Sequence, residues 1–188
     1  MLHRNVIFRG TNVIPRAISS LDVKNQREFF EQLDSACAPP CEVLTIPHNT
    51  NYSWGLTFSR TDEDGAAYSD SDLERRSRIE RLFEVTQQKG DSECQLGVGA
   101  TDEDCNIGNM FPPCEEQGDR RCANESSFLR NVLLDGMALG TQKTINPYKL
   151  GVIGSTDTHT SDPGNTRGGV PHRFKAAEGI GFAVDRLM

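Results

Sequence analysis

Two apolar runs in the sequence end in side chains that could bind a metal ion. The run at residues 150–153 is followed by Asp157 and His159, and the run at residues 43–47 is followed by His48. Residues two apart on an extended backbone point to the same side, so the Asp157 carboxylate and the His159 imidazole would converge on one point. Because α/β folds keep their chemistry at strand ends, we expect these three side chains to form one metal site.

Each of these signals is weak when it is taken alone. A single histidine after an apolar strand is more often a hydrogen-bonded structural residue than a ligand, and Asp-x-His often occurs by chance. Here a histidine follows each of two apolar runs, and both lie at the point where a strand would end. The combination favours a metal site over two unrelated structural histidines.

The composition limits the class of protein. The chain has 188 residues, of which 36% are hydrophobic, and a formal net charge of -7. That length is enough for a single domain with a core over residues 1–188. Nucleic-acid binding is disfavoured because no Lys/Arg cluster offsets the negative charge. A membrane span is not expected, since no apolar stretch approaches the roughly 20 residues that one needs.

The six cysteines suggest disulfides rather than a zinc site. Four of them lie in a polar loop, residues 90–122, which we interpret as an insertion, and their spacing does not resemble paired C-x-x-C motifs. An even number in such a loop favours disulfides and a periplasmic or secreted protein. Reduced cysteines in a cytosolic protein are the alternative. Many pairings are possible; the one we predict is Cys37–Cys41, Cys94–Cys105 and Cys114–Cys122.

Helical and extended patterns alternate along the chain. Strands are predicted at residues 3–8, 41–46, 81–86 and 150–153, and helices at residues 25–35, 70–80, 126–141 and 174–188. Asn25 and Glu28 resemble a capping box at the start of the first helix. The third helix should bury one apolar face, made by Phe128, Val132, Leu133 and Met137. This order predicts an α/β fold with a mainly parallel sheet, as in part of a barrel.

Four motifs, taken together and in order, resemble the DUF3604 family: residues 4–9, 46–51, 89–94 and 154–160. That family is similar to the PHP (polymerase and histidinol phosphatase) superfamily. The resemblance implies a distorted (β/α) barrel that binds divalent metal ions such as Zn²⁺ or Mn²⁺. It matches His48, Asp157 and His159 to metal ligands. Glu84 is a further candidate ligand, because the superfamily often places a site residue on that strand.

One departure from the superfamily pattern bears on function. The superfamily opens with His-x-His, then an Asp-His pair and a Glu, and none of these has a counterpart here. His3 is the only histidine before His48. We therefore expect this chain to be the C-terminal half of a PHP-like barrel, with an incomplete metal site.

The resemblance implies metal-assisted hydrolysis and points to a small-molecule phosphoester as substrate. Lys89 and Arg167 could offset phosphate charge, and Asn49 could orient the substrate. The plainer interpretation is that Lys89 and Arg167 are solvated surface cations and that Asn49 caps a turn. Ser155 is not favoured as a nucleophile because G-x-S-x-G is absent. Two alternatives stay open: a secreted, disulfide-stapled binding domain, and an inactive fragment.

Overall fold

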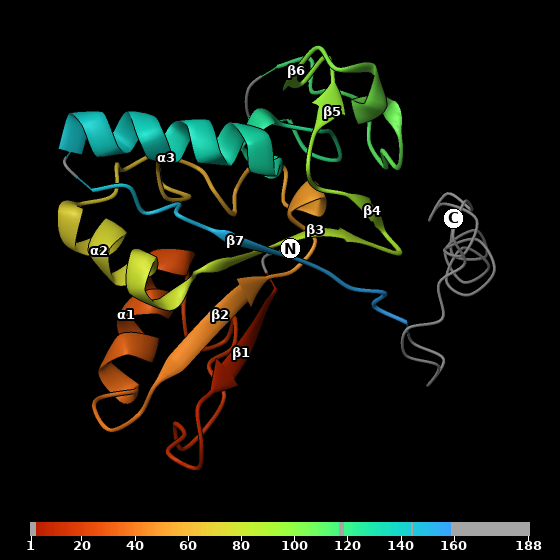
Figure 1. Ribbon diagram of the computed structural model, residues 1–188. Helices are drawn as coiled ribbons and strands as arrows, with labels where there is room; N and C mark the ends of the chain where they lie inside the picture. The colour runs from red at the N-terminus through yellow and green to blue at the C-terminus, as the bar shows by residue number, and fades with distance from the viewer. Residues whose placement is uncertain (1–2, 117–118, 144, 159–188) are drawn as a thin grey trace.

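The computed structural model describes residues 3–116, 119–143 and 145–158 (Figure 1). Its strands are β1 (Arg4–Phe8), β2 (Val43–Pro47), β3 (Leu82–Gln87), β4 (Gly90–Asp91), β5 (Gln95–Leu96), β6 (Gly99–Ala100) and β7 (Gly151–Gly154). Its α-helices are α1 (Gln26–Ala36), α2 (Asp70–Ile79) and α3 (Leu129–Lys143). The helix expected at residues 174–188 lies outside the described residues.

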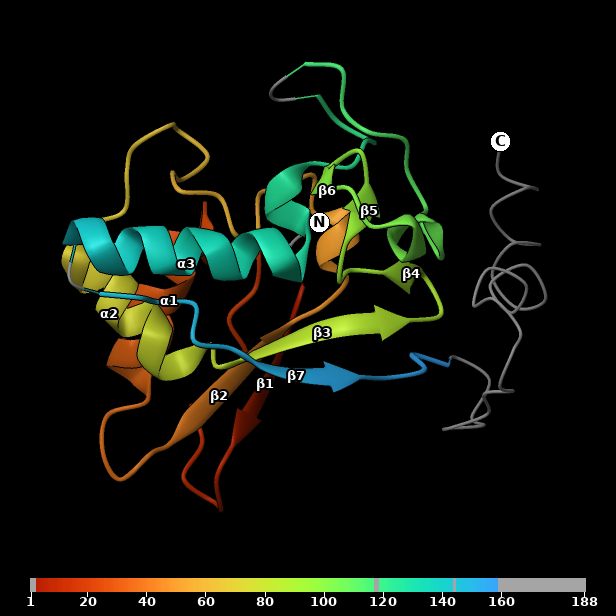
Figure 2. The same cartoon turned by 45° about the horizontal axis from the view of Figure 1, so that its top comes forward.

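The strands form a mixed arrangement rather than a mainly parallel one. β1 pairs antiparallel with β2, while β3 pairs parallel with β7 and antiparallel with β4. A parallel bridge between Thr45 and Glu80 connects β2 to the residues just before β3. These pairings place the strands in the order β1, β2, β3 and β7, and Figures 1 and 2 show β1 beside β2 and β3 beside β7. The α/β class is confirmed, but the described part of the chain contains no closed barrel.

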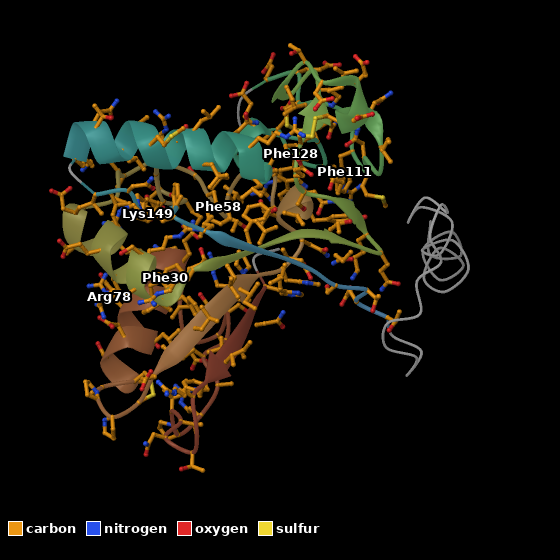
Figure 3. All side chains as sticks on the ribbon, viewed as in Figure 1. Phe30, Phe58, Arg78, Phe111, Phe128 and Lys149 are labelled. Carbon is orange, nitrogen blue, oxygen red and sulfur yellow. A yellow bond between two sulfur atoms is a disulfide. The ribbon has the colours of Figure 1, made fainter. Side chains whose placement is uncertain are left out.

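Two apolar clusters fix the helices on these strands. The larger one lies between β3, α2 and α3, and includes Phe58, Phe83 and Val132, each fully buried. The smaller one lies between α1, α2 and the β1–β2 pair, and is built around Phe30 and Leu33. Figure 3 shows Phe58 and Phe30 in these two separate clusters. Burial of such side chains, at about 1.5–3 kcal/mol each, holds the layers together.

The helix starts follow local capping chemistry. At α1, the Asn25 side chain accepts a hydrogen bond from the Glu28 backbone N–H, as expected. The Glu28 carboxylate, however, accepts from the backbone N–H of Lys24 instead of Asn25, so only half of the predicted capping box forms. A complete box occurs at α2, where Ser69 and Asp72 cap each other's backbone N–H.

The position of α3 differs from the sequence-based prediction. The helix begins at Leu129, and the preceding residues 125–127 form a short 3-10 turn that Asn124 caps. Met137, predicted on the buried face, is 57% exposed. Met137 lies about 140° around the helix axis from Val132, because the two are five residues apart and each residue turns the helix by about 100°. The buried positions follow i+3 and i+4 spacing instead: Leu129, Val132, Gly136 and Leu139.

The cysteine-rich region carries two of the three disulfides. All three predicted pairs are confirmed: Cys37–Cys41, Cys94–Cys105 and Cys114–Cys122. Three disulfides are typical of proteins that fold in an oxidising environment. None of the described helices is long and apolar enough to cross a bilayer.

Candidate active site

The candidate site lies at the carboxyl ends of three strands. His48 directly follows β2, Glu84 lies within β3, and Asp157 lies three residues after β7. Because β2, β3 and β7 run in the same direction, their carboxyl ends share one edge of the sheet. The topology therefore brings together side chains from three distant segments.

Glu84 is buried and binds three protein donors. Its Oε2 lies 3.0 Å from His48 Nδ1 and accepts a hydrogen bond of 3.1 Å from the Asn49 backbone N–H. Its Oε1 accepts a 2.6 Å hydrogen bond from the Ser155 hydroxyl. Burial alone raises the pKa of Glu84, but the hydrogen bonds from His48, Ser155 and Asn49 outweigh it and hold the pKa below its ordinary value. An ionised Glu84 assigns the proton to His48 Nδ1.

Asp157 faces the other side of the His48 ring. Its Oδ2 lies 3.7 Å from His48 Nε2 and also contacts the Lys89 ammonium. Its backbone carbonyl accepts a hydrogen bond from the Gln88 side-chain amide. The φ angle of Asp157 is +49°, a left-handed conformation that Asp tolerates better than most residues. Two carboxylates thus flank one imidazole, with a single ammonium beside the outer carboxylate.

Lys89 and Asn49 line the same edge. The Lys89 side chain is 23% exposed. Burial lowers its pKa, and the charge of Glu84 opposes that shift only in part. Asn49 is left-handed at φ +53°, and its side-chain oxygen accepts a hydrogen bond from the Gln87 amide. Asn49 thus contacts Glu84 through its backbone N–H and Gln87 through its side-chain oxygen.

His3 completes the edge from β1. The antiparallel pairing of β1 and β2 brings His3 beside His48, where the two rings stack at 6.2 Å with an interplanar angle of 10°. The His3 carbonyl accepts a 3.0 Å hydrogen bond from the His48 backbone N–H. Burial, followed by the neighbouring His48 and Lys89 charges, lowers the pKa of His3. No motif in the sequence pointed to this residue, since it has no His two positions away.

The structure brings together five of the seven residues singled out in the sequence. His48, Glu84, Asp157, Asn49 and Lys89 lie at one edge of the sheet. The other two, His159 and Arg167, lie outside the described residues. Across residues 3–116, 119–143 and 145–158, no three His, Cys, Asp or Glu side chains form a group that could hold a metal ion.

The sequence did not reveal the partners of Glu84 and Asp157. The sequence indicated Ser155 only as a disfavoured nucleophile, whereas in the structure its hydroxyl donates a hydrogen bond to the Glu84 carboxylate. The Gln88 side-chain amide donates to the backbone carbonyl of Asp157, which lies 69 positions further along the chain, so nothing in the sequence indicated this contact. A polar residue directly after a strand is the single signal that could have indicated Ser155.

Comparison with known families agrees with the motifs. The family model described as "Protein of unknown function (DUF3604)" matches residues 1–169. No curated protein matches the chain, and no solved structure does.

Proposed function

The chain belongs to the DUF3604 family, and on this premise we propose that it is part of a PHP-like metal-dependent hydrolase that acts on a small phosphoester. The observation that carries the proposal is the orientation of His48. Its Nδ1 is bound to the buried Glu84 carboxylate, and its Nε2 faces Asp157. A histidine that binds a metal ion through one ring nitrogen almost always donates the other N–H to a carboxylate, a carbonyl or water.

The spacing of the outward-facing atoms suits a single divalent ion. Nitrogen and oxygen ligands lie about 2.0–2.2 Å from Zn²⁺, so two of them at a tetrahedral angle are about 3.4 Å apart. His48 Nε2 and Asp157 Oδ2 are 3.7 Å apart. A small rotation of either side chain reconciles this distance with shared coordination. Zn²⁺ or Mn²⁺ is therefore the proposed cofactor.

Further ligands have to come from beyond the described residues. We propose His159 as one of them, because it lies two positions after Asp157. The Lys89 ammonium contacts Asp157 Oδ2. An ion shared with His48 Nε2 would therefore bind this carboxylate through Oδ2 once Lys89 has turned from it toward the substrate.

The surrounding side chains have distinct proposed roles. A bound divalent ion would supply Lewis acidity and lower the pKa of a coordinated water. Glu84, with both oxygens engaged by protein donors, is proposed to hold His48 with Nε2 available, rather than to bind the ion itself. Lys89 would offset the negative charge of the phosphoester, with Arg167 as a second cation. Asn49 supports Glu84 through its backbone N–H.

The proposed location is the periplasm or the outside of the cell. The support is the set of three disulfides, which would not persist among the reducing thiols of the cytosol.

Binding of Zn²⁺ and Mn²⁺ by the purified chain tests the proposal. Isothermal titration would compare the wild type with His48→Gln and Asp157→Asn, which each remove one proposed ligand. Loss of a partner that orients a ligand weakens metal binding about 10–100-fold, so we expect this range for Glu84→Gln and at least as much for the ligand variants. The matched control is Asp135→Asn, because that carboxylate pairs with Arg60 away from the site.

Three outcomes separate the candidates. Equal metal affinity in the wild type and the three site variants would refute the site. If the folded protein bound no metal ion, the second candidate, a disulfide-stapled binding domain, would be favoured. The observation that supports this candidate is the ion pair between Lys89 and Asp157, which neutralises the charge of a proposed metal ligand. Metal binding with metal-dependent turnover of p-nitrophenyl phosphate, abolished by His48→Gln, would support the hydrolase.

A further inference from the structure

We infer that Asn51 and residues 108–111 of the cysteine-rich region position Lys89 in the candidate site. The cysteine-rich region would then belong to the framework of the site rather than being a peripheral insertion. The inference goes beyond the proposed function, because it concerns the placement of Lys89 and holds whether or not the site binds a metal ion.

The first part of this framework is the buried side chain of Asn51. Its amide Nδ2 donates a 3.0 Å hydrogen bond to the Lys89 carbonyl. Its backbone N–H donates a 3.1 Å hydrogen bond to the Ser92 hydroxyl. Asn51 is 5% exposed; its bond to Ser92 is buried, and its bond to Lys89 is partly buried. They tie the turn after His48 to Lys89, in the turn between β3 and β4, and to Ser92, which directly follows β4.

The second part packs against the same turn from the cysteine-rich region. The Gly108 carbonyl accepts a 3.0 Å hydrogen bond from the Asp91 backbone N–H. A Cβ atom at Gly90 would lie 2.4 Å from the Gly108 oxygen and 2.7 Å from Met110 Cγ. Gly90 also has φ +109°, which side-chain-bearing residues rarely adopt. The contact is therefore so close that only glycine fits at position 90.

Residues 108–111 are in turn held by their own contacts. The Phe111 ring packs edge-on against Tyr52 at a centroid distance of 4.7 Å, and Figure 3 shows Phe111 at the cysteine-rich end of the molecule. The Asn109 side chain donates a 3.0 Å hydrogen bond to the Cys105 carbonyl. Cys105 is joined to Cys94 by a disulfide, which closes the loop that precedes this segment.

The position of Lys89 follows from these contacts. Its backbone N–H donates a 2.7 Å hydrogen bond to the Gln87 side chain, and its carbonyl is held by Asn51. With both backbone groups fixed, the side chain extends to Asp157 across the sheet edge. A shift of the turn would withdraw the ammonium from Asp157 without disturbing either apolar cluster.

The test is the rate at which Lys89 reacts with an amine-directed acylating reagent, measured by mass spectrometry on metal-free protein. The variants are Gly90→Ala and Asn51→Ala, and the matched control is Gly97→Ala. Gly97 has φ +80° but nothing within 4 Å of an added Cβ, so it carries the backbone strain without the clash. Lys143, paired with Asp70, reports any general loosening of the fold.

We expect Lys89 to react about two- to fivefold faster in Gly90→Ala and in Asn51→Ala, the factor by which a partly exposed ion pair shifts an equilibrium. Asp157→Asn should show the same rise, while Lys143 should be unchanged in every variant. If Gly90→Ala does not fold, Asn51→Ala decides the question.

The inference is overturned if Lys89 reacts no faster in these variants than in Gly97→Ala, or if Lys89 and Lys143 accelerate together. Because the labelling uses no metal, a failure of the proposed metal site would leave this result unaffected. Conversely, normal metal binding in Gly90→Ala would not rescue the inference if the reactivity of Lys89 were unchanged.

Discussion

Replacing Glu80 by Gln should destabilise the protein strongly, because Glu80 compensates two buried cations. Its side chain is fully buried, and those of Arg4 and Arg76 are 4% and 5% exposed. The Arg4 Nε lies 2.6 Å from Glu80 Oε2, and the Arg76 Nη2 lies 2.5 Å from Oε1. The Arg76 guanidinium also stacks 4.5 Å from the Phe58 ring centroid. This group of charges lies where the two apolar clusters meet.

The expected loss is about 3 kcal/mol in the free energy of unfolding. Removing one partner of a buried ion pair costs about 3–5 kcal/mol, because the remaining charge stays buried without compensation. The lower end of the range applies, since the Gln amide keeps one oxygen that can accept from Arg4 or Arg76. A reduction of this size is a large part of the roughly 5–15 kcal/mol that stabilises a typical domain.

The effect should depend on pH in one direction. Burial alone raises the pKa of Glu80, but the charges of Arg4 and Arg76 outweigh it and hold the pKa below its ordinary value of 4.5. A depressed folded-state pKa stabilises the protein fully above the unfolded pKa, and this stabilisation is lost as the pH falls through the folded pKa. The difference between wild type and Glu80→Gln should therefore be full at neutral pH and shrink in acid.

Urea unfolding with the disulfides intact measures this difference. The fluorescence of the single tryptophan, Trp54, and circular dichroism should report the same midpoint if unfolding is two-state. The matched control is Glu42→Gln, because Glu42 pairs with Arg9 at the surface, with side chains 64% and 80% exposed. We expect that control to unfold like the wild type. Equal midpoints for Glu80→Gln and Glu42→Gln at neutral pH would refute the reasoning.

Three further changes test the packing, the caps and the disulfides by urea unfolding. Phe58→Ala should cost about 3–5 kcal/mol, because its ring is fully buried; a loss no larger than that of Ser69→Ala would contradict this placement. Ser69→Ala should cost about 1 kcal/mol, because it removes the cap of α2, and helix content should fall only slightly. Replacing Cys114 and Cys122 by Ser should cost about 2–3 kcal/mol, and an unchanged midpoint would count against that disulfide.

Local features of the fold were predictable from the sequence because they depend on near neighbours. The Asn25 cap and the disulfide Cys37–Cys41, which encloses two prolines, each involve residues at most four positions apart. The positions of β1, β2, β3 and β7 followed from short apolar runs, with shifts of one or two residues, whereas β4, β5 and β6 lie in the region that was interpreted as a loop. The face of α3 was predicted less well, because the position of Met137 depends on where the helix packs and not on its own periodicity.

The candidate site was predictable only in its separate pieces. His48 and Asp157 stood out because each follows an apolar run, and the resemblance to a family placed Glu84 near them. Their mutual geometry came from the parallel alignment of β2, β3 and β7, which no single segment encodes. The same holds for His3, which reaches His48 only because β1 pairs antiparallel with β2.

The sequence by itself determined the α/β class, the short Cys37–Cys41 loop and the candidate residues at two strand ends, because capping, periodicity and short loop closure act over a few residues. The tertiary structure alone decided the mixed direction of the strands, the burial of Glu84 against His48 and Ser155, and the contact of Lys89 with Asp157. These features depend on pairing between distant strands, where burial of whole faces selects one register among many that local patterns allow.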